Sequence, residues 1–385
     1  MRIVIVGGAG DMGRVACRAT VEDPEIESVL IADRDAFRAA ELATTLGSKA
    51  SATALDITDA GELVNTLREA DLVLNTVGPF YLFGPPVLEA AIEAGCHYAD
   101  IADDWEPTLE MLRLDDAARE AGIIALIGMG ASPGLSNLLA AGAHRELDFT
   151  QKLHTVWRGG SGVPKAPENP DDVRPSAAID HWIHNLAEPI RIWRDGEAQQ
   201  ADALEQLEVE VPGIGAAPVW TCGHPEPITL PIAFPEISES LNLMFARPGL
   251  IDAARAVRDR VRAGELSVAE GSKEFILSSG RRGPDAGPVP DFPGVFAYAE
   301  GTRDGRRVRV TVSTNAFPEG GMGESTCIPL AIAAGMVARD EVKTRGVMGP
   351  EACIDPEVMF KRLVPYSGAR EGEPLLDVRI APIDD

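Results

Sequence analysis

The segment from residue 2 to residue 33 constrains the fold of this 385-residue chain more than any other. Residues 2–6 form an apolar, β-branched run, which is typical of a strand buried on both faces of a parallel sheet. The sequence GAGDMG follows at residues 8–13, and a helical stretch runs from 14 to about 21. A second apolar run, residues 28–32, ends at Asp33. This order of strand, glycine turn, helix, strand and acid predicts a dinucleotide-binding βαβ unit.

Each part of this unit has a physical role in holding a dinucleotide. Gly8 is expected to make the tight turn, Gly10 to let the backbone approach the pyrophosphate, and Gly13 to let the helix pack closely. The helix N-terminus offers free N–H groups and a positive dipole end to the phosphates. Asp33 suits the adenosine ribose hydroxyls and favours NAD, whereas Arg34 suits the 2′-phosphate of NADP, so both cofactors stay open. The cofactor residues predicted here are Gly8, Ala9, Gly10, Asp11, Met12, Gly13, Asp33 and Arg34.

Strands and helices continue to alternate as far as residue 127. We expect further strands at 52–56, 72–77, 96–101 and 123–127, with helices at 60–70, 84–94 and 106–121. The carboxyl ends of such strands face the ligand crevice of a doubly wound sheet. The residues predicted at these ends are Asp56 near the adenine, Thr76, Val77, Gly78 and Pro79 near the nicotinamide ribose, and Phe80 and Tyr81 near the substrate.

Two carboxylates at the end of strand 96–101 are the best candidates for proton transfer. Asp100 ends this strand and Asp103 lies just beyond it, while Tyr98 shares a strand face with Asp100. A bound amine or imine needs a group of this kind to take up or release a proton. A structural interpretation stays open as well, in which Asp103 and Asp104 cap the next helix and Tyr98 is a core residue with a bonded hydroxyl.

The middle of the chain predicts a second domain that also contains strands and helices. Residues 154–158 and 190–193 are expected strands, and a hairpin is expected around the turn Asp304-Gly305, whose residues suit a tight turn. The Gly- and Pro-rich stretches 159–175 and 281–294 are expected loops.

Several segments resemble the saccharopine dehydrogenase-like oxidoreductases. They are GGAGDMG at 7–13, NTVGPFYLFGPPVLEAAIEAGCHYADIADD at 75–104, and GMGASPGLSN at 128–137, with a further match at 324–329 and 346–347. The turn at 132–134 with Asn137 is closer to the lysine 6-dehydrogenase version than to that of saccharopine reductase.

This resemblance implies an α/β homodimer with two lobes. Residues 1–130 would form the Rossmann domain with its doubly wound parallel sheet, residues 131–318 a second α/β domain with a mixed sheet, and residues 319–385 a segment that returns to the Rossmann lobe. It also implies hydride transfer between NAD or NADP and the amine or imine carbon of an amino-acid-type substrate. In the second domain Ser176 is expected near this substrate, unless it only caps a helix. The candidate arginines for a substrate carboxylate are Arg158, Arg174 and Arg247.

Two other functions stay open, a C=C (enoyl) reductase and a cofactor-binding sensor without turnover. Composition narrows the partners, because 60 acidic against 35 basic residues give a formal net charge of −25, which disfavours nucleic acids and membrane surfaces. Five scattered cysteines and the lack of a signal-peptide pattern or a long apolar run favour a cytoplasmic protein. No cysteine lies beside His181 and His184 in the sequence, and we expect no metal site.

Overall fold

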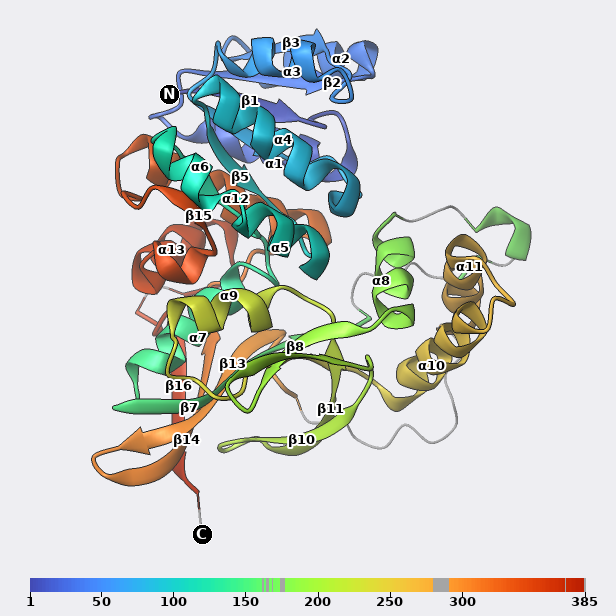
Figure 1. The fold of residues 1–385 in the computed structure, drawn as a ribbon, viewed down its shortest axis with the longest axis vertical. Helices are drawn as coiled ribbons and strands as arrows, with labels where there is room; N and C mark the ends of the chain where they lie inside the picture. The colour runs from blue at the N-terminus through green and yellow to red at the C-terminus, as the bar shows by residue number, and fades with distance from the viewer. Residues whose placement is uncertain are drawn as a thin grey trace. The chain divides into compact units, whose positions relative to one another are not determined.

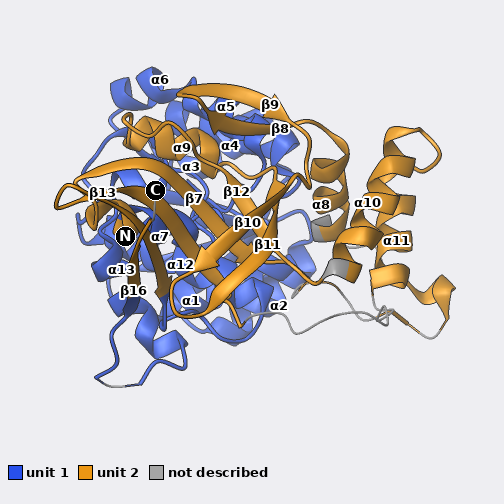
Figure 2. Ribbon diagram, turned by 90° about the horizontal axis from the view of Figure 1, so that it is seen from below, with its two compact units in different colours: residues 1–141, 314–377 blue, residues 142–313, 378–385 orange. Residues whose placement is uncertain are grey.

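A computed structural model gives the fold of the chain. It describes residues 1–160, 163, 166–167, 169–173, 177–279, 291–370 and 372–383. These residues form two compact units, which are coloured separately in Figure 2. The first unit consists of residues 1–141 and 314–377, and the second of residues 142–313 and 378–385.

The first unit is built on a seven-stranded parallel sheet with the order β15-β6-β5-β4-β1-β2-β3 (Figure 1). Its strands are β1 (Arg2–Val6), β2 (Ser28–Asp33), β3 (Ala50–Ala54), β4 (Leu72–Asn75), β5 (His97–Asp100), β6 (Ile124–Leu126) and β15 (Gly346–Met348). The strand order reverses between β1 and β4, which pair with each other. This is the doubly wound arrangement that the sequence predicts, and β1 and β4 flank its switch point.

Helices enclose this sheet, as the apolar strands require. Residues 3–6 of β1 and all of β4 are buried, so both faces of the central strands are covered. Within the unit α1 packs against α12, and α4 packs against α3 and α5. The helices are α1 (Asp11–Glu22), α2 (Ala36–Leu46), α3 (Ala60–Leu67), α4 (Phe80–Ala94), α5 (Trp105–Leu112), α6 (Asp115–Glu120), α7 (Leu135–Arg145), α12 (Met322–Ala338) and α13 (Pro356–Leu363).

Some predicted boundaries of these elements are wrong. The strand expected at 52–56 is Ala50–Ala54, and the strand expected at 72–77 already ends at Asn75, whose side-chain oxygen accepts a hydrogen bond from the Val77 N–H. The helix expected from 84 begins at Phe80. Pro79 is the N-cap residue of this helix, and Pro85 and Pro86 lie inside it. The helix expected at 106–121 is the pair α5 and α6.

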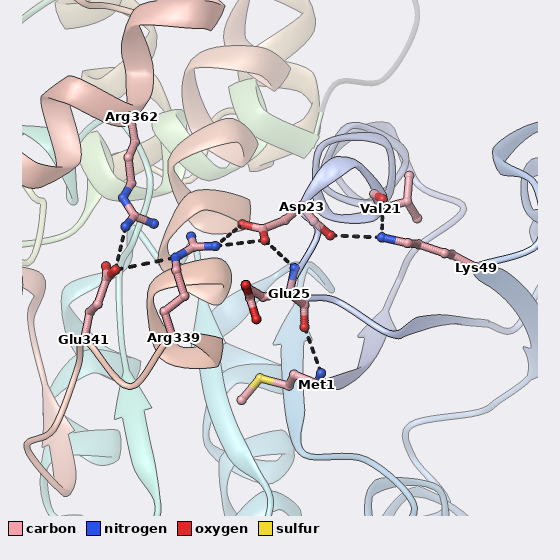
Figure 3. A network of polar contacts seen from close by, with 8 residues as sticks. All are labelled: Met1, Val21, Asp23, Glu25, Lys49, Arg339, Glu341 and Arg362. Atoms are coloured by element: carbon pink, nitrogen blue, oxygen red, sulfur yellow. Dashed lines mark hydrogen bonds and ion pairs between the residues drawn. The ribbon is translucent and has the colours of Figure 1, made fainter.

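An ion-pair network ties the C-terminal segment of the first unit to its N-terminal part (Figure 3). Arg339 follows α12, and one guanidinium nitrogen lies 2.9 Å from each carboxylate oxygen of Asp23, at the end of α1. Glu341 accepts from Arg362 at 2.6 Å, and Lys49 donates to the Asp23 carbonyl at 3.0 Å. Residues 314–377 are therefore an integral part of the first unit.

The second unit is built on a mixed sheet with the order β10-β11-β12-β7-β13-β14-β16. Its strands are β7 (Phe149–Arg158), β10 (Gln206–Val211), β11 (Gly215–Cys222), β12 (Asn242–Phe245), β13 (Val295–Arg303), β14 (Arg306–Thr314) and β16 (Leu376–Pro382). β8 (Ile190–Arg194) and β9 (Glu197–Ala201) form a separate hairpin. The unit also contains helices α8 (Ala177–Ala187), α9 (Glu226–Ala233), α10 (Pro248–Arg262) and α11 (Val268–Ser279).

Pairing in this sheet explains two features of the second unit. β7 and β12 run parallel, whereas β13 and β14 form an antiparallel hairpin around the predicted turn at Asp304-Gly305. Both turn residues have positive φ, 51° and 72°, as a tight hairpin turn requires. The strand β16 is the neighbour of β14 in the sheet, so the residues from 378 onward group with the second unit. None of the helices described is long and apolar enough to cross a membrane.

Candidate functional site

The loop after β1 forms a backbone cradle at the carboxyl edge of the first sheet. Its left-handed turn is at Gly7, with φ of +73°, and not at Gly8, the residue predicted from the sequence. The reason is that the chain turns one residue earlier, directly after Val6 ends the strand. A Cβ atom on Gly13 would lie 2.1 Å from the Gly7 carbonyl oxygen and 2.6 Å from Gly8 Cα. Only glycine therefore lets the first turn of α1 pack so closely on this loop.

The free N–H groups of the cradle lie at the first turn of α1. The Ala9 N–H donates to Asp33 at 3.0 Å, and the Gly10 N–H donates to the Gly7 carbonyl at 3.0 Å. The N–H groups of the next three residues, 11–13, begin the helix, and Gly10 as N-cap has no side chain to accept from them. A phosphate anion fits such a helix end. Ala9 and Gly10 thus allow close approach, while residues 11–13 supply the donors.

Asp33 is fixed against the cradle by two main-chain hydrogen bonds. One carboxylate oxygen accepts from Ala9 and the other from the Asp35 N–H, both at 3.0 Å. Each oxygen keeps a second lone pair, which a ribose hydroxyl can use. Arg34 is exposed next to it. Asp56 is exposed past the end of β3, where hydrogen bonds from the Thr58 side chain and N–H lower the pKa of its carboxyl group.

The segment after β4 lies beside the cradle. The Thr76 hydroxyl and N–H both donate to the Val6 carbonyl, at 2.8 and 3.1 Å. A Cβ atom on Gly7 would lie 2.8 Å from Cγ2 of Val77, so the two loops are in contact across the switch point. The Gly78–Pro79 peptide bond is cis. The structure therefore places Thr76 and Val77 beside the turn that begins the glycine loop.

The two aromatic residues predicted near the substrate differ in exposure. Phe80 is 7% exposed, whereas Tyr81 is 47% exposed. Both begin α4, at the carboxyl end of β4. Of the two, Tyr81 has the side chain that a ligand at this edge can reach.

Asp100, Tyr98 and Asn75 form a fully buried polar cluster under the same edge. The Tyr98 hydroxyl donates to Asp100 at 2.7 Å and accepts from the Asn75 amide at 3.2 Å. The other Asp100 oxygen accepts the N–H groups of Gly128 at 2.6 Å and Ala102 at 3.1 Å. Burial raises the pKa of Asp100 to about 6, although these hydrogen bonds oppose the shift. Burial and the nearby Asp100 carboxylate also raise the pKa of Tyr98 well above its usual value.

The contacts of this cluster stabilise the fold of the first unit. Its hydrogen bonds join β4, β5 and the loop that begins at Gly128, and none of its three side chains is exposed. Asp103, in contrast, is partly exposed beyond the end of β5. Asp104 occupies the N-cap position of α5 but makes no side-chain capping hydrogen bond there. The geometry thus separates Asp103, which a ligand can reach, from Asp100 and Tyr98, which it cannot.

Sequence reasoning missed a buried glutamate at this edge. Glu351, 8% exposed, accepts a hydrogen bond from the Asn137 amide at 3.0 Å. The Asn137 oxygen in turn accepts from the Gly134 N–H at 2.9 Å. Asn137 belongs to a segment that the resemblance singled out, but 214 residues separate it from Glu351. Only the parallel pairing of β15 with β6 brings the two together.

Of the four substrate residues predicted in the second unit, the structure describes two, Arg158 and Arg247. Arg158 donates to the Phe292 carbonyl and lies 3.5 Å from the Asp291 carboxylate. Arg247 is the exposed N-cap residue of α10. Ser176 and Arg174 lie outside the residues that the structure describes.

Comparison with known proteins shows what the dinucleotide-binding segment and the whole chain are similar to. The model of the saccharopine dehydrogenase NADP binding domain matches residues 3–126. A carboxyaminopropylagmatine dehydrogenase from Synechocystis is 24% identical over 391 residues, which cover 94% of this chain and 95% of that protein. An NADP(+)-dependent, L-glutamate-forming saccharopine dehydrogenase from Schizosaccharomyces pombe is 25% identical over 164 residues, 42% of this chain and 35% of that protein.

A solved structure has the same fold over the whole chain. The apo saccharopine dehydrogenase (L-Glu forming) from Saccharomyces cerevisiae superposes with a TM-score of 0.62 at 18% identity, and 99% of each chain is covered. The glycine cradle, the helix end and the acid that ends β2 are the parts that a nicotinamide dinucleotide requires. Residues 3–126 therefore form a saccharopine dehydrogenase NADP binding domain, and the whole chain has the fold of a saccharopine dehydrogenase.

Proposed function

We propose that this protein oxidises a C–N bond, or reduces the corresponding imine, in an amino-acid-type substrate. The observation that carries the proposal is the similarity along nearly the whole chain to a protein named for dehydrogenation of carboxyaminopropylagmatine. This similarity extends through the second unit, outside the dinucleotide-binding domain. When bound, the nicotinamide supplies the hydride acceptor or donor.

Residues at the carboxyl edge of the first unit would hold the cofactor. The N–H groups of residues 11–13 would bind the pyrophosphate, and Asp33 would accept from the adenosine ribose hydroxyls. Because the Asp33 carboxylate is held in place by two N–H donors, it would repel a 2′-phosphate, which favours NAD over NADP. Arg34 would offset part of this repulsion.

Asp103 is the group that we propose to accept a proton from the substrate amine. It lies at the edge where the cofactor segments meet, and it is partly exposed. Asp100 and Tyr98 are proposed as positioning residues, because the Gly128 and Ala102 N–H groups and the Tyr98 hydroxyl hold the Asp100 carboxylate in the interior. Tyr81 is proposed to contact the substrate from the exposed start of α4.

A cofactor-reduction assay tests the proposal. Purified protein is mixed with NAD⁺ or NADP⁺ and with a panel of amino acids and N-substituted amino acids, and the absorbance of the reduced nicotinamide is followed. We expect reduction only with an amine substrate, and faster reduction with NAD⁺. Oxidation of NADH by an enoyl thioester but by no imine would instead support a C=C reductase. Tight cofactor binding without turnover in either direction would support a sensor.

A variant pair tests the role of Asp103. Asp103→Asn is expected to lower kcat by about a hundredfold or more, the usual range for a general base, and to leave cofactor affinity unchanged. It is also expected to abolish the acidic limb of the pH profile of kcat/KM. Asp116→Asn, at an exposed position on α6, is the control. An Asp103→Asn enzyme with wild-type kcat and pH profile would rule out this role.

A further inference from the structure

Asn75 ends β4, and its buried amide makes hydrogen bonds in two directions. The amide oxygen accepts from the Val77 N–H at 3.0 Å. The amide nitrogen donates to the Tyr98 hydroxyl at 3.2 Å, and at 3.5 Å to the Phe83 carbonyl. The bond to Val77 closes a turn of the kind that asparagine side chains commonly make with the main chain two residues on. Asn75 therefore directs how the chain leaves β4 at the carboxyl edge of the sheet.

Tyr98 fixes the orientation of this amide. Its hydroxyl has one hydrogen, which it donates to Asp100 at 2.7 Å, so the hydroxyl oxygen is left to accept from Asn75. A flipped amide would place oxygen against oxygen at Tyr98 and N–H against N–H at Val77. Tyr98 thus holds Asn75 in the orientation in which the amide oxygen faces the Val77 N–H.

Asp100 extends the network to the next strand end. Its side chain accepts from the Gly128 N–H at 2.6 Å, and its main-chain carbonyl accepts from the Met129 N–H at 2.8 Å. The strands β4, β5 and β6 are neighbours in the sheet. Hydrogen bonds therefore link the carboxyl ends of three adjacent parallel strands, and Asn75 is the member of this network that reaches residues 76–79.

The segment beyond β4 has two anchors and then an open position. Thr76 donates its hydroxyl and its N–H to the Val6 carbonyl, at 2.8 and 3.1 Å, and Val77 donates to Asn75. Gly78 follows and is exposed. A Cβ atom on Gly78 would meet none of the described atoms within 4 Å, apart from those of its chain neighbours. Glycine thus leaves space beside the main chain into which a ligand can approach closely.

The position of β4 in the sheet indicates which part of the cofactor approaches Gly78. The strand β1 separates β4 from β2, the strand that ends at Asp33. Asp33 suits the adenosine ribose, and a dinucleotide lies across the switch point with its two halves on opposite sides. The segment after β4 therefore lies on the side of the nicotinamide half.

We propose that Asn75 is a positioning residue for the nicotinamide half of the cofactor. It acts through the Val77 N–H, because holding this group fixes where Gly78 and Pro79 present their main chain. Tyr98 acts one step further back, through Asn75. The inference rests on the proposed use of a nicotinamide cofactor, with residues 76–79 beside its ribose. The pyrophosphate depends on residues 11–13 instead.

Calorimetric titrations with NADH and with ADP test the proposal, because ADP lacks the nicotinamide and its ribose. Asn75→Leu replaces the amide with an apolar group of similar size and releases the Val77 N–H. We expect the Kd for NADH to rise about threefold to tenfold, as for the loss of about one hydrogen bond. The Kd for ADP is expected to stay unchanged, because Thr76 still anchors the segment to the Val6 carbonyl. The fluorescence anisotropy of bound NADH should fall, since the nicotinamide is held less firmly.

Tyr98→Phe tests the order of action and is a milder change than Asn75→Leu. It keeps the ring in the core but removes the hydroxyl that orients Asn75, so we expect it to raise only the Kd for NADH. Because Tyr98 acts through Asn75, the double variant is expected to bind NADH as Asn75→Leu alone does. Met359→Ala is the control for lost stability, since Met359 is buried on α13, outside this network. We expect this control to unfold at a lower temperature and to bind both ligands as the wild type does.

Two results would overturn the positioning role of Asn75. One is an equal rise in the Kd for NADH and for ADP, and the other is wild-type NADH binding by both Asn75→Leu and Tyr98→Phe. Additive effects in the double variant would overturn the order of action. None of these measurements needs a substrate. A protein that shows the expected binding pattern but reduces NAD⁺ with no amine would refute the proposed function and leave the role of Asn75 in place.

Discussion

Replacing Gly13 with alanine tests whether the cradle depends on the close approach of α1 to the glycine loop. The new Cβ atom would lie 2.1 Å from the Gly7 carbonyl oxygen, whereas ordinary contacts begin at 3.4 Å. The obstacle is main chain, which no rotamer change relieves, so the loop and the helix must separate by more than 1 Å. Overpacking of this kind costs about 1–3 kcal/mol. Alanine returns about 0.5–1 kcal/mol of that through its higher helix propensity.

Gly61→Ala is the matched control, since Gly61 also lies in the first turn of a helix of the same unit. Its Cβ atom would meet only an Asp59 oxygen, at 3.4 Å. We expect Gly61→Ala to stabilise the protein by up to about 1 kcal/mol and to leave cofactor affinity unchanged. Calorimetric unfolding and NADH titration measure both effects.

Gly13→Ala is expected to lower the free energy of unfolding and to raise the Kd for NADH by about tenfold or more, since tenfold corresponds to about 1.4 kcal/mol. The displaced loop no longer holds the N–H groups of residues 11–13 in register with the phosphates. If Gly13→Ala has the same unfolding temperature and the same Kd for NADH as the wild type, the cradle does not depend on this contact.

Three further predictions concern stability and substrate attraction. The raised pKa of Asp100, about 6 against 3.8, means that the folded state keeps a proton that the unfolded state releases, so this contribution to stability is lost as pH rises from about 4 to 6. Asp100→Asn removes this ionisable group. Urea titrations between pH 4 and pH 6 should therefore show that the free energy of unfolding of the variant, relative to that of the wild type, rises by about 3 kcal/mol. Arg339→Ala breaks the half-buried pair with Asp23 and should cost about 1.5–3 kcal/mol in the same assay; Arg119→Ala, at a more exposed pair, should cost less than about 1 kcal/mol. If the substrate is a cationic amine, the net charge of −25 should make kcat/KM fall as salt is added, and a flat salt dependence would exclude this attraction.

The cofactor cradle is the part of the site that the sequence predicts best, because its chemistry is local. The apolar run before Gly7, the glycines and Asp33 all lie within one βαβ unit, and each acts on neighbours close in the chain. The same local reasoning misplaced the tight turn by one residue, since Gly7 and Gly8 differ only in conformation. It also placed the start of α4 at residue 84, four residues after Phe80, where the helix begins.

Contacts between distant segments were beyond such reasoning. The hydrogen bond between Asn137 and Glu351 and the ion pair between Asp23 and Arg339 each join residues more than 200 positions apart. Both depend on β15 and α12 returning to the first unit. The sequence pattern for Asp100 and Tyr98 fits a catalytic as well as a structural role, and only their burial distinguishes the two. Burial of this kind is set by the whole unit, not by the residues near them in the chain.

Transfer of an isotope from substrate to cofactor tests the central claim most directly. An amine substrate found in the reduction assay is prepared with deuterium in place of every hydrogen on each carbon bonded to nitrogen, and it is incubated with the enzyme and NAD⁺. Mass spectrometry then measures the reduced nicotinamide. We expect one deuterium in each NADH formed, because the hydride leaves the C–N carbon. NADH that forms without deuterium would contradict oxidation at that carbon, and with it the proposed function.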